Sequence, residues 1–456
     1  MDNVITRNPT TGEELERYAF TSERDVDQAL RRAVSAQGRW SAAPIADRAA
    51  AIRRLAVILA DRRAQLAARI VLEMGKPINQ AVTEIDKCVV TCNYYADHLE
   101  SVLQARDIDV APDVARVHYR PLGVVFAILP WNYPWWQVIR AMLPAIGAGN
   151  TVVLKHADSV TGCAFEIQAV LFEAFGEHVL STVVLPGSRA SALIADPRVA
   201  GVTFTGSEQV GGLVGGAAGA ALKKTVLELG GSDPFLILDD ADIEQAAAAA
   251  VRSRFLNNGQ SCIAAKRLLI HRSIRDDAVD AIRAHVEKLV VGDPFDPETD
   301  IGPLARFDLR DALVGQRQRA SIQGARVLAQ APAPTGPGAW FAPTIMEIPS
   351  STSPIFREET FGPLGAVSTF ASDEEAVSLA NDTAYGLSSS IWTTDENRAQ
   401  MMAGQIQAGS VFINAISVSD PRLPVGGVKA SGYGRELAEW GAHEFTNVQA
   451  VRVGRS

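Results

Sequence analysis

The sequence predicts an α/β protein with two parallel-sheet domains and a small β extension. Short, continuous apolar runs alternate with helical patterns between residues 124 and 229, and a second alternation begins at residue 234. Continuous runs of this kind are typical of parallel sheets that helices cover on both faces. At 456 residues the chain is also long enough for two or three domains with a large core.

Composition and charge exclude several classes of protein. Apolar residues make up 47% of the chain and charged residues 21%, which are ordinary values for a globular protein. The net charge is −9 and no basic run occurs, so we expect neither nucleic acid nor an anionic membrane as a partner. No apolar run is long enough to cross a membrane, and residues 1–7 lack the apolar stretch of a signal peptide.

The four cysteines do not form the framework of a disulfide-rich protein, because they are few and no C-x-x-C motif occurs. Cys88 and Cys92 are spaced i, i+4 on a predicted helix, but no histidine or acidic cluster accompanies them. Core packing therefore explains this pair better than a metal site does. We expect no bound metal and a reducing, cytoplasmic compartment.

The first third of the chain is predicted to be helical. Residues 23–74 show the apolar stripes of two amphipathic helices, and Gly75 with Pro77 marks the end of the second. A third helix is expected from residue 78 to about residue 103. Residues 105–120 contain two short β-like pieces, which we interpret as a hairpin extension and not as part of the core.

Five apolar runs then predict the first parallel sheet. They cover residues 124–129, 151–154, 180–185, 202–205 and 225–229, with helical patterns between them. A nucleotide-binding α/β domain is the natural interpretation, and its ligand should lie beyond the carboxyl ends of the strands. No G-x-G-x-x-G motif occurs at a strand-to-helix turn, so the usual fingerprint does not identify the cofactor.

The second alternation contains the most informative turn of the chain. An Ala-rich helix is expected from Asp242 to about Phe255, after which Asn257, Asn258 and Gly259 break the helix before Cys262. The apolar strand at residues 268–270 follows. A cysteine on such a turn is accessible to a substrate, although a small buried hydrophobe is the alternative interpretation.

Polar residues at three other strand ends suggest chemistry. Asn132 follows the first strand between two prolines, where its amide could form one arm of an oxyanion hole. Glu228 lies within an apolar run, and burial would raise the pKa of its carboxyl group, as a general base requires; a structural ion pair is the alternative. Ser207 begins a helix and could bind a phosphate or serve only as an N-cap.

Six motifs, in order and spacing, resemble the aldehyde dehydrogenase superfamily. They lie at residues 130–134, 204–207, 228–231, 258–262, 359–363 and 426–436. The resemblance covers nearly the whole chain. Residues 154–157, 231–235 and 262–267 are further similar to the shorter bacterial succinate-semialdehyde dehydrogenases.

The resemblance implies a role for each matching residue. Cys262 would be the nucleophile, Asn132 and the Cys262 backbone N–H the oxyanion donors, and Glu228 the base for deacylation. Lys155 and Glu359 would hold the two cofactor riboses, Phe361 would lie near the nicotinamide and Ser207 at the pyrophosphate. The full set of implied cofactor-binding residues is Trp131, Lys155, Asp158, Gly206, Ser207, Glu359 and Phe361.

Arg140 is the implied ligand of the substrate carboxylate, with a surface arginine as the alternative. A second arginine found in some relatives is Leu256 here, which leaves the carboxylate clamp incomplete. Trp136 and the loop at residues 417–422 are expected to line the tunnel mouth. Within that loop, Arg422 could supply the missing positive charge.

The family fold implies how the chain divides and assembles. Residues 1–99 and 119–229 would form the cofactor domain, residues 230–430 the catalytic domain, and residues 100–118 and 431–456 an oligomerisation extension. We expect a homodimer or a dimer-of-dimers tetramer. NAD is the expected cofactor, because Asp158 can bind ribose hydroxyls and would repel the extra phosphate of NADP; NADP stays possible.

Other functions are less consistent with the sequence. A cysteine hydrolase needs a paired histidine, and none of the seven histidines lies in an obvious motif. In a CoA-acylating dehydrogenase a thiol replaces water, whereas Glu228 favours hydrolysis. Retention of Cys262, Asn132 and Glu228 together argues against a non-catalytic protein. Oxidation of another small aldehyde remains an alternative to oxidation of succinic semialdehyde.

Overall fold

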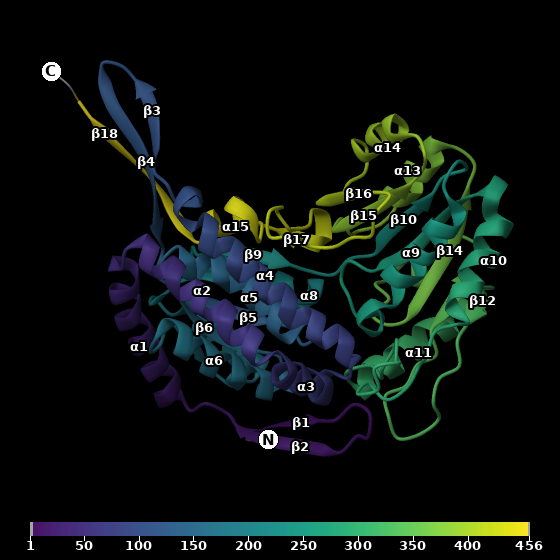
Figure 1. The fold of residues 1–456 in the computed structure, drawn as a ribbon, viewed down its shortest axis with the longest axis horizontal. Helices are drawn as coiled ribbons and strands as arrows, with labels where there is room; N and C mark the ends of the chain where they lie inside the picture. Colours follow the sequence, from purple (N-terminus) through teal and green to yellow (C-terminus); the bar gives the residue numbers. More distant parts are fainter. Residues whose placement is uncertain (1–2, 455–456) are drawn as a thin grey trace.

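The computed structural model describes residues 3–454 and contains two α/β units with a β arm that projects from one of them (Figure 1). Residues 1–2 and 455–456, the ends of two predicted domain ranges, lie outside the described residues. The strands form two large sheets, one three-stranded sheet and a two-stranded hairpin. The predicted α/β architecture of two mainly parallel sheets is therefore present.

The N-terminal segment supplies a hairpin and four helices. β1 (Asn3–Arg7) and β2 (Glu14–Ala19) pair antiparallel, and then come α1 (Glu23–Ala42), α2 (Ile45–Asp61), α3 (Arg63–Met74) and α4 (Ile78–Val102). The structure thus has three helices where the sequence predicts two. The additional break is at Arg62, with φ −99° and ψ 9°. The buried stripe continues from Leu59 to Leu66 across the break, so periodicity does not reveal it.

The first large sheet has the strand order β17-β9-β8-β5-β6-β7, parallel except for β17. Its strands are β5 (Val124–Leu129), β6 (Thr151–His156), β7 (Leu180–Thr182), β8 (Val199–Thr205), β9 (Lys224–Glu228) and β17 (Gly432–Tyr433). The chain runs outward from β5 to β7 and then returns to β8 on the other side of β5. In open α/β sheets, ligands bind at the carboxyl ends of the strands beside such a reversal, which here are the ends of β5 and β8.

Helices cover both faces of this sheet, as the continuous apolar strands predict. Val125 and Ala127 of β5 pack towards α2–α4, α5 (Pro134–Gly147) and α6 (Thr161–Phe175). Their neighbours Val124 and Phe126 point the other way, towards α1, α7 (Ala190–Ala195) and α8 (Glu208–Ala220). Alternate residues of one strand therefore belong to two separate cores.

The second large sheet has the order β12-β13-β14-β11-β10-β15-β16, parallel except for β12. Its strands are β10 (Asp233–Ile237), β11 (Ala265–His271), β12 (Arg326–Gln330), β13 (Thr344–Glu347), β14 (Leu364–Phe370), β15 (Ser388–Trp392) and β16 (Ser410–Ile413). α9 (Ile243–Phe255) and α10 (Arg275–Val286) cover one face. The other face carries α11 (Phe307–Ile322), α12 (Pro354–Arg357), α13 (Asp373–Asn381) and α14 (Glu396–Ala403).

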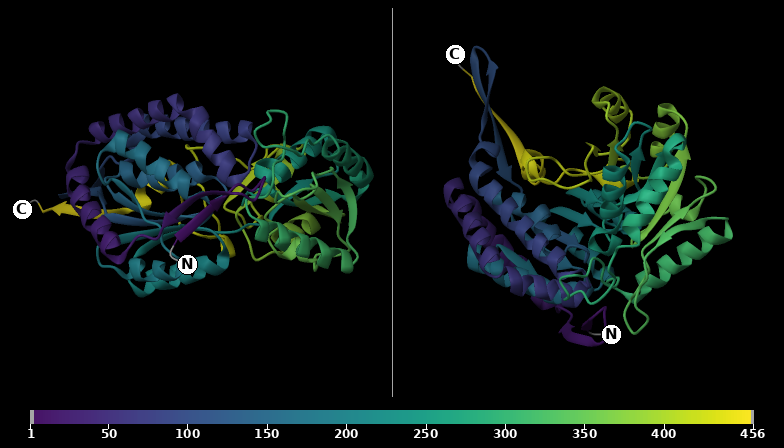
Figure 2. Two further views of the ribbon diagram at one scale, coloured as in Figure 1. Left: turned by 90° about the horizontal axis from the view of Figure 1, so that it is seen from below. Right: turned by 45° about the vertical axis from the view of Figure 1, so that its right-hand side comes forward.

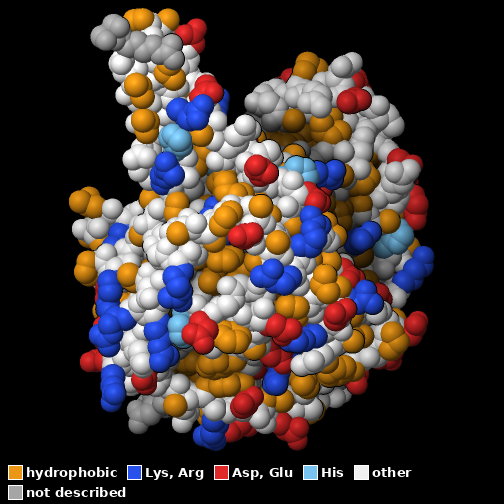
Figure 3. All heavy atoms as spheres, turned by 60° about the vertical axis from the view of Figure 1, so that its left-hand side comes forward, with side chains coloured by type: hydrophobic (Ala, Val, Ile, Leu, Met, Phe, Trp, Pro, Cys, Tyr) orange, Lys and Arg blue, Asp and Glu red, His pale blue; other side chains and the backbone are white. Residues whose placement is uncertain are grey.

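The arm is an antiparallel sheet of β3 (Arg106–Val110), β4 (Asp113–Pro121) and β18 (Thr446–Val453), and it stands away from both α/β units in every view (Figures 1 and 2). The hairpin that the sequence predicts is β3 and β4. Apolar side chains are exposed along the arm (Figure 3). They belong to Ile108, Val114, Val448, Val451 and Val453.

Three further features of the described residues are their surface charge, the hydropathy of their helices and their metal-binding side chains. Acidic and basic side chains are interspersed on the face drawn in Figure 3. Among residues 3–454, no helix is long and apolar enough to cross a bilayer. The same residues contain no group of three or more His, Cys, Asp or Glu side chains that could hold a metal ion.

Candidate active site

Cys262 lies on the loop between the short helix at Leu256–Gly259 and β11. It is partly exposed, whereas Cys88, Cys92 and Cys163 are buried. The preceding turn is left-handed, with φ of 59° at Asn257, 57° at Asn258 and 70° at Gly259. Asn and Gly adopt this conformation at the least cost, which explains why α9 ends where the sequence predicts.

Position 259 requires glycine for a second reason, because the neighbouring backbone leaves no room for a side chain. A Cβ atom at this position would lie 2.5 Å from the carbonyl carbon of Gly362. The buried Arg254 joins the two segments, because its Nη2 donates to the carbonyl oxygens of Gly259 at 2.5 Å and Gly362 at 2.6 Å. The cysteine loop is therefore packed backbone to backbone against the segment that follows Glu359.

Asn132 lies beside the cysteine loop, although the two are far apart in the sequence. Its Nδ2 donates to the Gln260 carbonyl at 3.1 Å, and its own carbonyl accepts from Asn257 Nδ2 at 2.9 Å. These two bonds join the turn after β5 to the turn before β11. An asparagine amide carries two hydrogens, so the bond to Gln260 leaves one for another acceptor.

Lys266 is a residue of this site to which the sequence analysis assigned no role. Its fully buried Nζ donates to the carbonyl oxygens of Cys262 at 2.8 Å and Gly231 at 2.5 Å, and to Glu359 Oε1 at 2.6 Å. The sequence does contain a sign of its role: Lys266 lies inside an apolar strand, where a buried ammonium needs hydrogen-bond partners. Lys266 fixes the backbone on which the cysteine is carried.

Glu228, the last residue of β9, is buried and lies in a group of three charges. Its Oε2 is 3.8 Å from Arg140 Nη2, and Arg140 Nε is also ion-paired with Glu436. Burial and the nearby Glu436 carboxylate raise the pKa of Glu228, although Arg140 opposes the rise. Glu228 thus has the raised pKa that the sequence predicts and also takes part in an ion pair, and its role as a general base stays a prediction.

The thiol of Cys262 is not activated by its surroundings alone. Burial raises its pKa to about 11, although the positive charges of Arg140 and Lys266 oppose the rise. At neutral pH the group is therefore a thiol and not the nucleophilic thiolate. The negative charges of Glu359 and Glu228 add to the rise in the pKa of Cys262.

The residues implied in cofactor binding lie around the carboxyl ends of β5, β6 and β8. Trp131 follows β5 and makes an edge contact with Phe361, with ring centroids 5.6 Å apart. Lys155 Nζ is 3.3 Å from Asp158 Oδ1 at the end of β6. Gly206 and Ser207 follow β8, where Ser207 Oγ caps α8 by accepting from the Val210 N–H at 3.4 Å.

These groups fit a dinucleotide. Thr205 Oγ1, beside Gly206, is buried without a hydrogen-bond partner among the described residues. Glu359 lies so close to the main chain that a Cβ at Gly230 would be 2.4 Å from its carboxylate. Carboxylates and an ammonium group suit ribose hydroxyls, the N–H groups of α8 suit phosphate, and the two aromatic rings suit a flat heterocycle.

The predicted substrate residues lie in two environments. Arg140 and Trp136 are buried on α5, and the Trp136 ring packs against Lys87 of α4. Arg422 instead points outward with 74% of its side chain exposed, and it forms two hydrogen bonds with Asp420. The positive charge that the sequence analysis assigned to Arg422 is thus already paired with a carboxylate.

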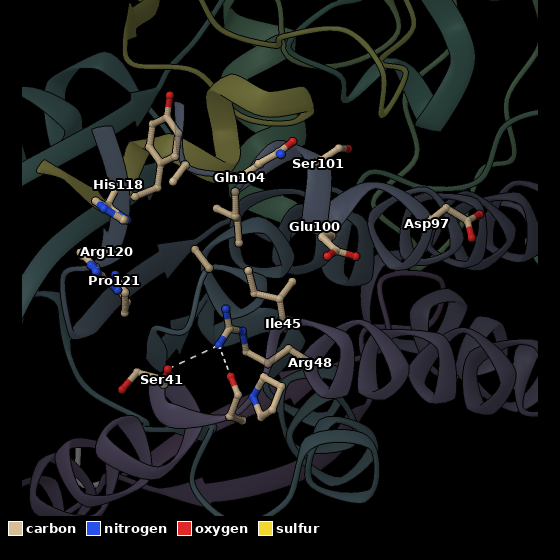
Figure 4. A pocket seen from close by; sticks show the side chains of 16 residues that line it. Ser41, Ile45, Arg48, Asp97, Glu100, Ser101, Gln104, His118, Arg120 and Pro121 are labelled. Atoms are coloured by element: carbon tan, nitrogen blue, oxygen red, sulfur yellow. Dashed lines mark hydrogen bonds between the residues drawn. The ribbon is translucent and has the colours of Figure 1, made fainter. Parts of the chain in front are cut away.

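A pocket of about 730 Å³ lies elsewhere, at the base of the arm (Figure 4). Ser41, Arg48, Glu100 and His118 are among its lining residues, and none of the predicted site residues is. Its central guanidinium, on Arg48, is held by the backbone carbonyl oxygens of Ser41, Ala43 and Gly147. Arg48 therefore serves the fold.

A sheet switch point that is hydrogen-bonded to the cysteine loop of a second α/β unit is an arrangement that suits a dinucleotide-dependent oxidoreductase. The model of the aldehyde dehydrogenase family matches residues 2–451, and the chain belongs to that family. This membership confirms the resemblance and the fold class inferred from the sequence. The protein is accordingly an NAD(P)-dependent aldehyde dehydrogenase.

Known relatives narrow the comparison. The succinate semialdehyde dehydrogenase [NAD(P)+] Sad of Escherichia coli K12 is 44% identical over 450 residues, which cover 98% of this chain and 97% of that protein. Succinic semialdehyde dehydrogenase from Streptococcus pyogenes, solved with NADP+, has a TM-score of 0.96 and 34% identity, covering 99% and 100%. PnpE, solved with nicotinamide adenine dinucleotide, has a TM-score of 0.95 and 34% identity, covering 99% and 94%.

Proposed function

We propose that this enzyme oxidises succinic semialdehyde to succinate and prefers NAD. The observation that carries the proposal is the convergence of Cys262, Asn132 and Glu228, with the positively charged Arg140 beside Glu228. The names of the similar proteins support the substrate, since several are succinate-semialdehyde dehydrogenases.

The residues divide the reaction into two stages. In the first, the thiol proton of Cys262 passes to bulk water and Sγ adds to the aldehyde carbon, while the Asn132 amide and the Cys262 N–H bind the resulting oxyanion. A bound nicotinamide dinucleotide supplies the hydride acceptor, which leaves the acyl group as a thioester on Cys262. In the second stage Glu228 takes a proton from water, the water attacks the thioester carbon, and the Cys262 thiolate leaves with the electrons of the C–S bond.

Substrate preference tests the proposed function directly. Succinic semialdehyde and butanal have the same number of carbons, but only the first carries a carboxylate. We expect kcat/KM to be at least about tenfold higher for succinic semialdehyde, because a charge-assisted hydrogen bond contributes about 1.5–3 kcal/mol. The rate of NADH formation with each aldehyde gives the ratio. Equal values would contradict the proposed substrate.

Replacing Asp158 by serine should move the cofactor preference towards NADP. In the parent, the Asp158 carboxylate would lie near the extra phosphate of NADP, and two such charges about 4 Å apart repel by roughly 4 kcal/mol at an effective dielectric of about 20. Lys155 and solvent reduce this figure, because Lys155 pairs with Asp158 and the Asp158 side chain is 53% exposed. We therefore expect the ratio of kcat/KM for NADP to that for NAD to rise by at least about tenfold.

The same measurement on Asp158→Asn separates charge from shape. Asparagine keeps the size of the side chain and removes its charge, so it should give most of the shift that serine gives. A parent enzyme that already favours NADP would show that Asp158 does not set the preference.

We also propose that the arm is the oligomerisation surface and that the enzyme acts in the cytoplasm. Five apolar side chains are exposed along the three strands of the arm, and a second copy of the chain is the partner that the family resemblance implies. The four cysteines are unpaired, which suits a reducing compartment.

A further inference from the structure

The substrate of the proposed reaction brings a carboxylate into a buried site, and this charge needs a partner there. Arg140 is the expected partner, but its guanidinium is already paired with Glu436 and lies 3.8 Å from Glu228. Arg422 is paired with Asp420 and points outward. Each positive charge that the sequence predicts for the substrate carboxylate is therefore already paired with a carboxylate of the protein.

Lys87 supplies such a charge. It lies on α4, and its Nζ is 4.3 Å from the centroid of the Trp136 ring on the neighbouring α5. The same Nζ donates to Ser419 Oγ at 2.7 Å, on the loop between β16 and the short helix at Lys429–Ser431. Lys87 thus stands where α4, α5 and the predicted tunnel-mouth loop meet.

The ammonium of Lys87 has no ion-pair partner in the part of the chain that the structure describes, since no carboxylate oxygen lies within 4.0 Å of it. The acidic residue of the adjoining loop, Asp420, accepts two hydrogen bonds from the Arg422 guanidinium, at 2.8 and 2.7 Å, and a third from the Arg422 backbone N–H at 2.9 Å. An ammonium has three donors, and among residues 3–454 only Ser419 accepts from one of them, so two are left for a ligand.

The electrostatic surroundings of Lys87 agree with an anion-binding role. Burial, together with the nearby charge of Arg140, lowers the pKa of Lys87 to about 8, although Cys88, Glu84 and Asp420 oppose the shift. Both of these carboxylates are paired with other cations, Glu84 with Lys76 and Asp420 with Arg422. The group is still mostly protonated at neutral pH. The direct contacts of the Lys87 ammonium are a ring face and a hydroxyl, both neutral, so an anion that binds beside it in this poorly solvated region would stabilise its charge.

We propose that Lys87 binds the carboxylate of the substrate together with Arg140 and makes the enzyme specific for aldehydes that carry an acid group. The inference rests on the proposed function, because it concerns the acid end of the same substrate. Lys87 acts in recognition alone: the reacting aldehyde is held at Cys262, and no bond is made or broken at the lysine.

Lys87→Met tests this role, because methionine keeps the length of the side chain and removes its charge. We expect KM for succinic semialdehyde to rise by at least about tenfold, while kcat and the KM for butanal stay within about twofold of the parent values. Lys87→Arg keeps the charge and should hold KM for succinic semialdehyde within about threefold. Lys288→Met removes the same charge from an exposed position and should leave the KM for both aldehydes unchanged.

Three results would overturn the proposal. The first is an unchanged KM for succinic semialdehyde in Lys87→Met. The second is an equal loss on succinic semialdehyde and butanal, which would show that Lys87 only holds the Ser419 loop in place. The third is a Lys87→Arg variant as impaired as Lys87→Met, which would assign the effect to packing. A different result would contradict the proposed function itself: equal kcat/KM values of the parent enzyme for succinic semialdehyde and butanal.

Discussion

Cys262→Ser will abolish aldehyde oxidation and leave the fold and cofactor binding intact. Serine differs from cysteine by one atom, but its hydroxyl is far less acidic than a thiol whose pKa is already about 11. We expect kcat to fall by at least about 10³-fold, which corresponds to roughly 4 kcal/mol of lost transition-state stabilisation. Steady-state formation of NADH measures the loss, and calorimetric titration with NAD measures cofactor binding.

The buried Cys92 provides a matched control. It lies in the core of the first α/β unit, so Cys92→Ser should lower stability more than it lowers turnover. Iodoacetamide should also label the parent at Cys262 before it labels the three buried cysteines. Substantial turnover in Cys262→Ser would remove this residue from the proposed mechanism.

Glu228→Gln should slow deacylation more than acylation, so that the thioester accumulates on Cys262. A positioned general base typically contributes about 10²–10⁴-fold, and we expect that loss in the steady-state rate. Because Gln cannot take a proton from water, the first turnover should appear as a burst of about one NADH per site. Stopped-flow absorbance separates the burst from the slow phase. Equal slowing of both phases, with no burst, would show that Glu228 does not act as the base in deacylation.

Glu436→Gln is the control for Glu228→Gln, and the dependence of kcat on pH is the quantity to measure. In the parent, burial and the charge of Glu436 raise the pKa of Glu228 to about 8, so the active carboxylate form and kcat should both increase as pH rises through that value. Glu436→Gln removes the like charge and frees Arg140 to pair with Glu228 alone, so this limb of the pH profile should move to lower pH. Glu228→Gln should lose the limb altogether.

Local chemistry explains which parts of the site the sequence could predict. Asn257, Asn258 and Gly259 mark a left-handed turn because those residue types tolerate positive φ, whatever surrounds them. Glu228 was identified because a carboxylate inside an apolar run is unusual in any fold. The nucleotide-binding sheet followed from five apolar runs, whose order in space then fixed the switch point.

The remaining features depend on contacts between distant segments. Lys266 is linked to Glu359 and Gly231, and Arg140 to Glu436, across separations that no periodic pattern encodes. In the sequence, Lys87 looks like any other charged residue of a helix. Its ammonium lies against Trp136 because α4 packs on α5, and the sequence pattern does not show this packing. The helix break at Arg62 was missed because it falls inside one continuous apolar stripe.

The edge strand β17 has a consequence for the order in which the protein folds on the ribosome. Residues 432–433 close the sheet that residues 124–228 begin, Glu436 then partners Arg140, and β18 completes the arm beside β4. The first α/β unit is therefore completed by residues that are synthesised only after the whole second unit. Until then its nascent core holds a buried guanidinium without Glu436, and β9 has an unpaired edge that other chains or chaperones can bind.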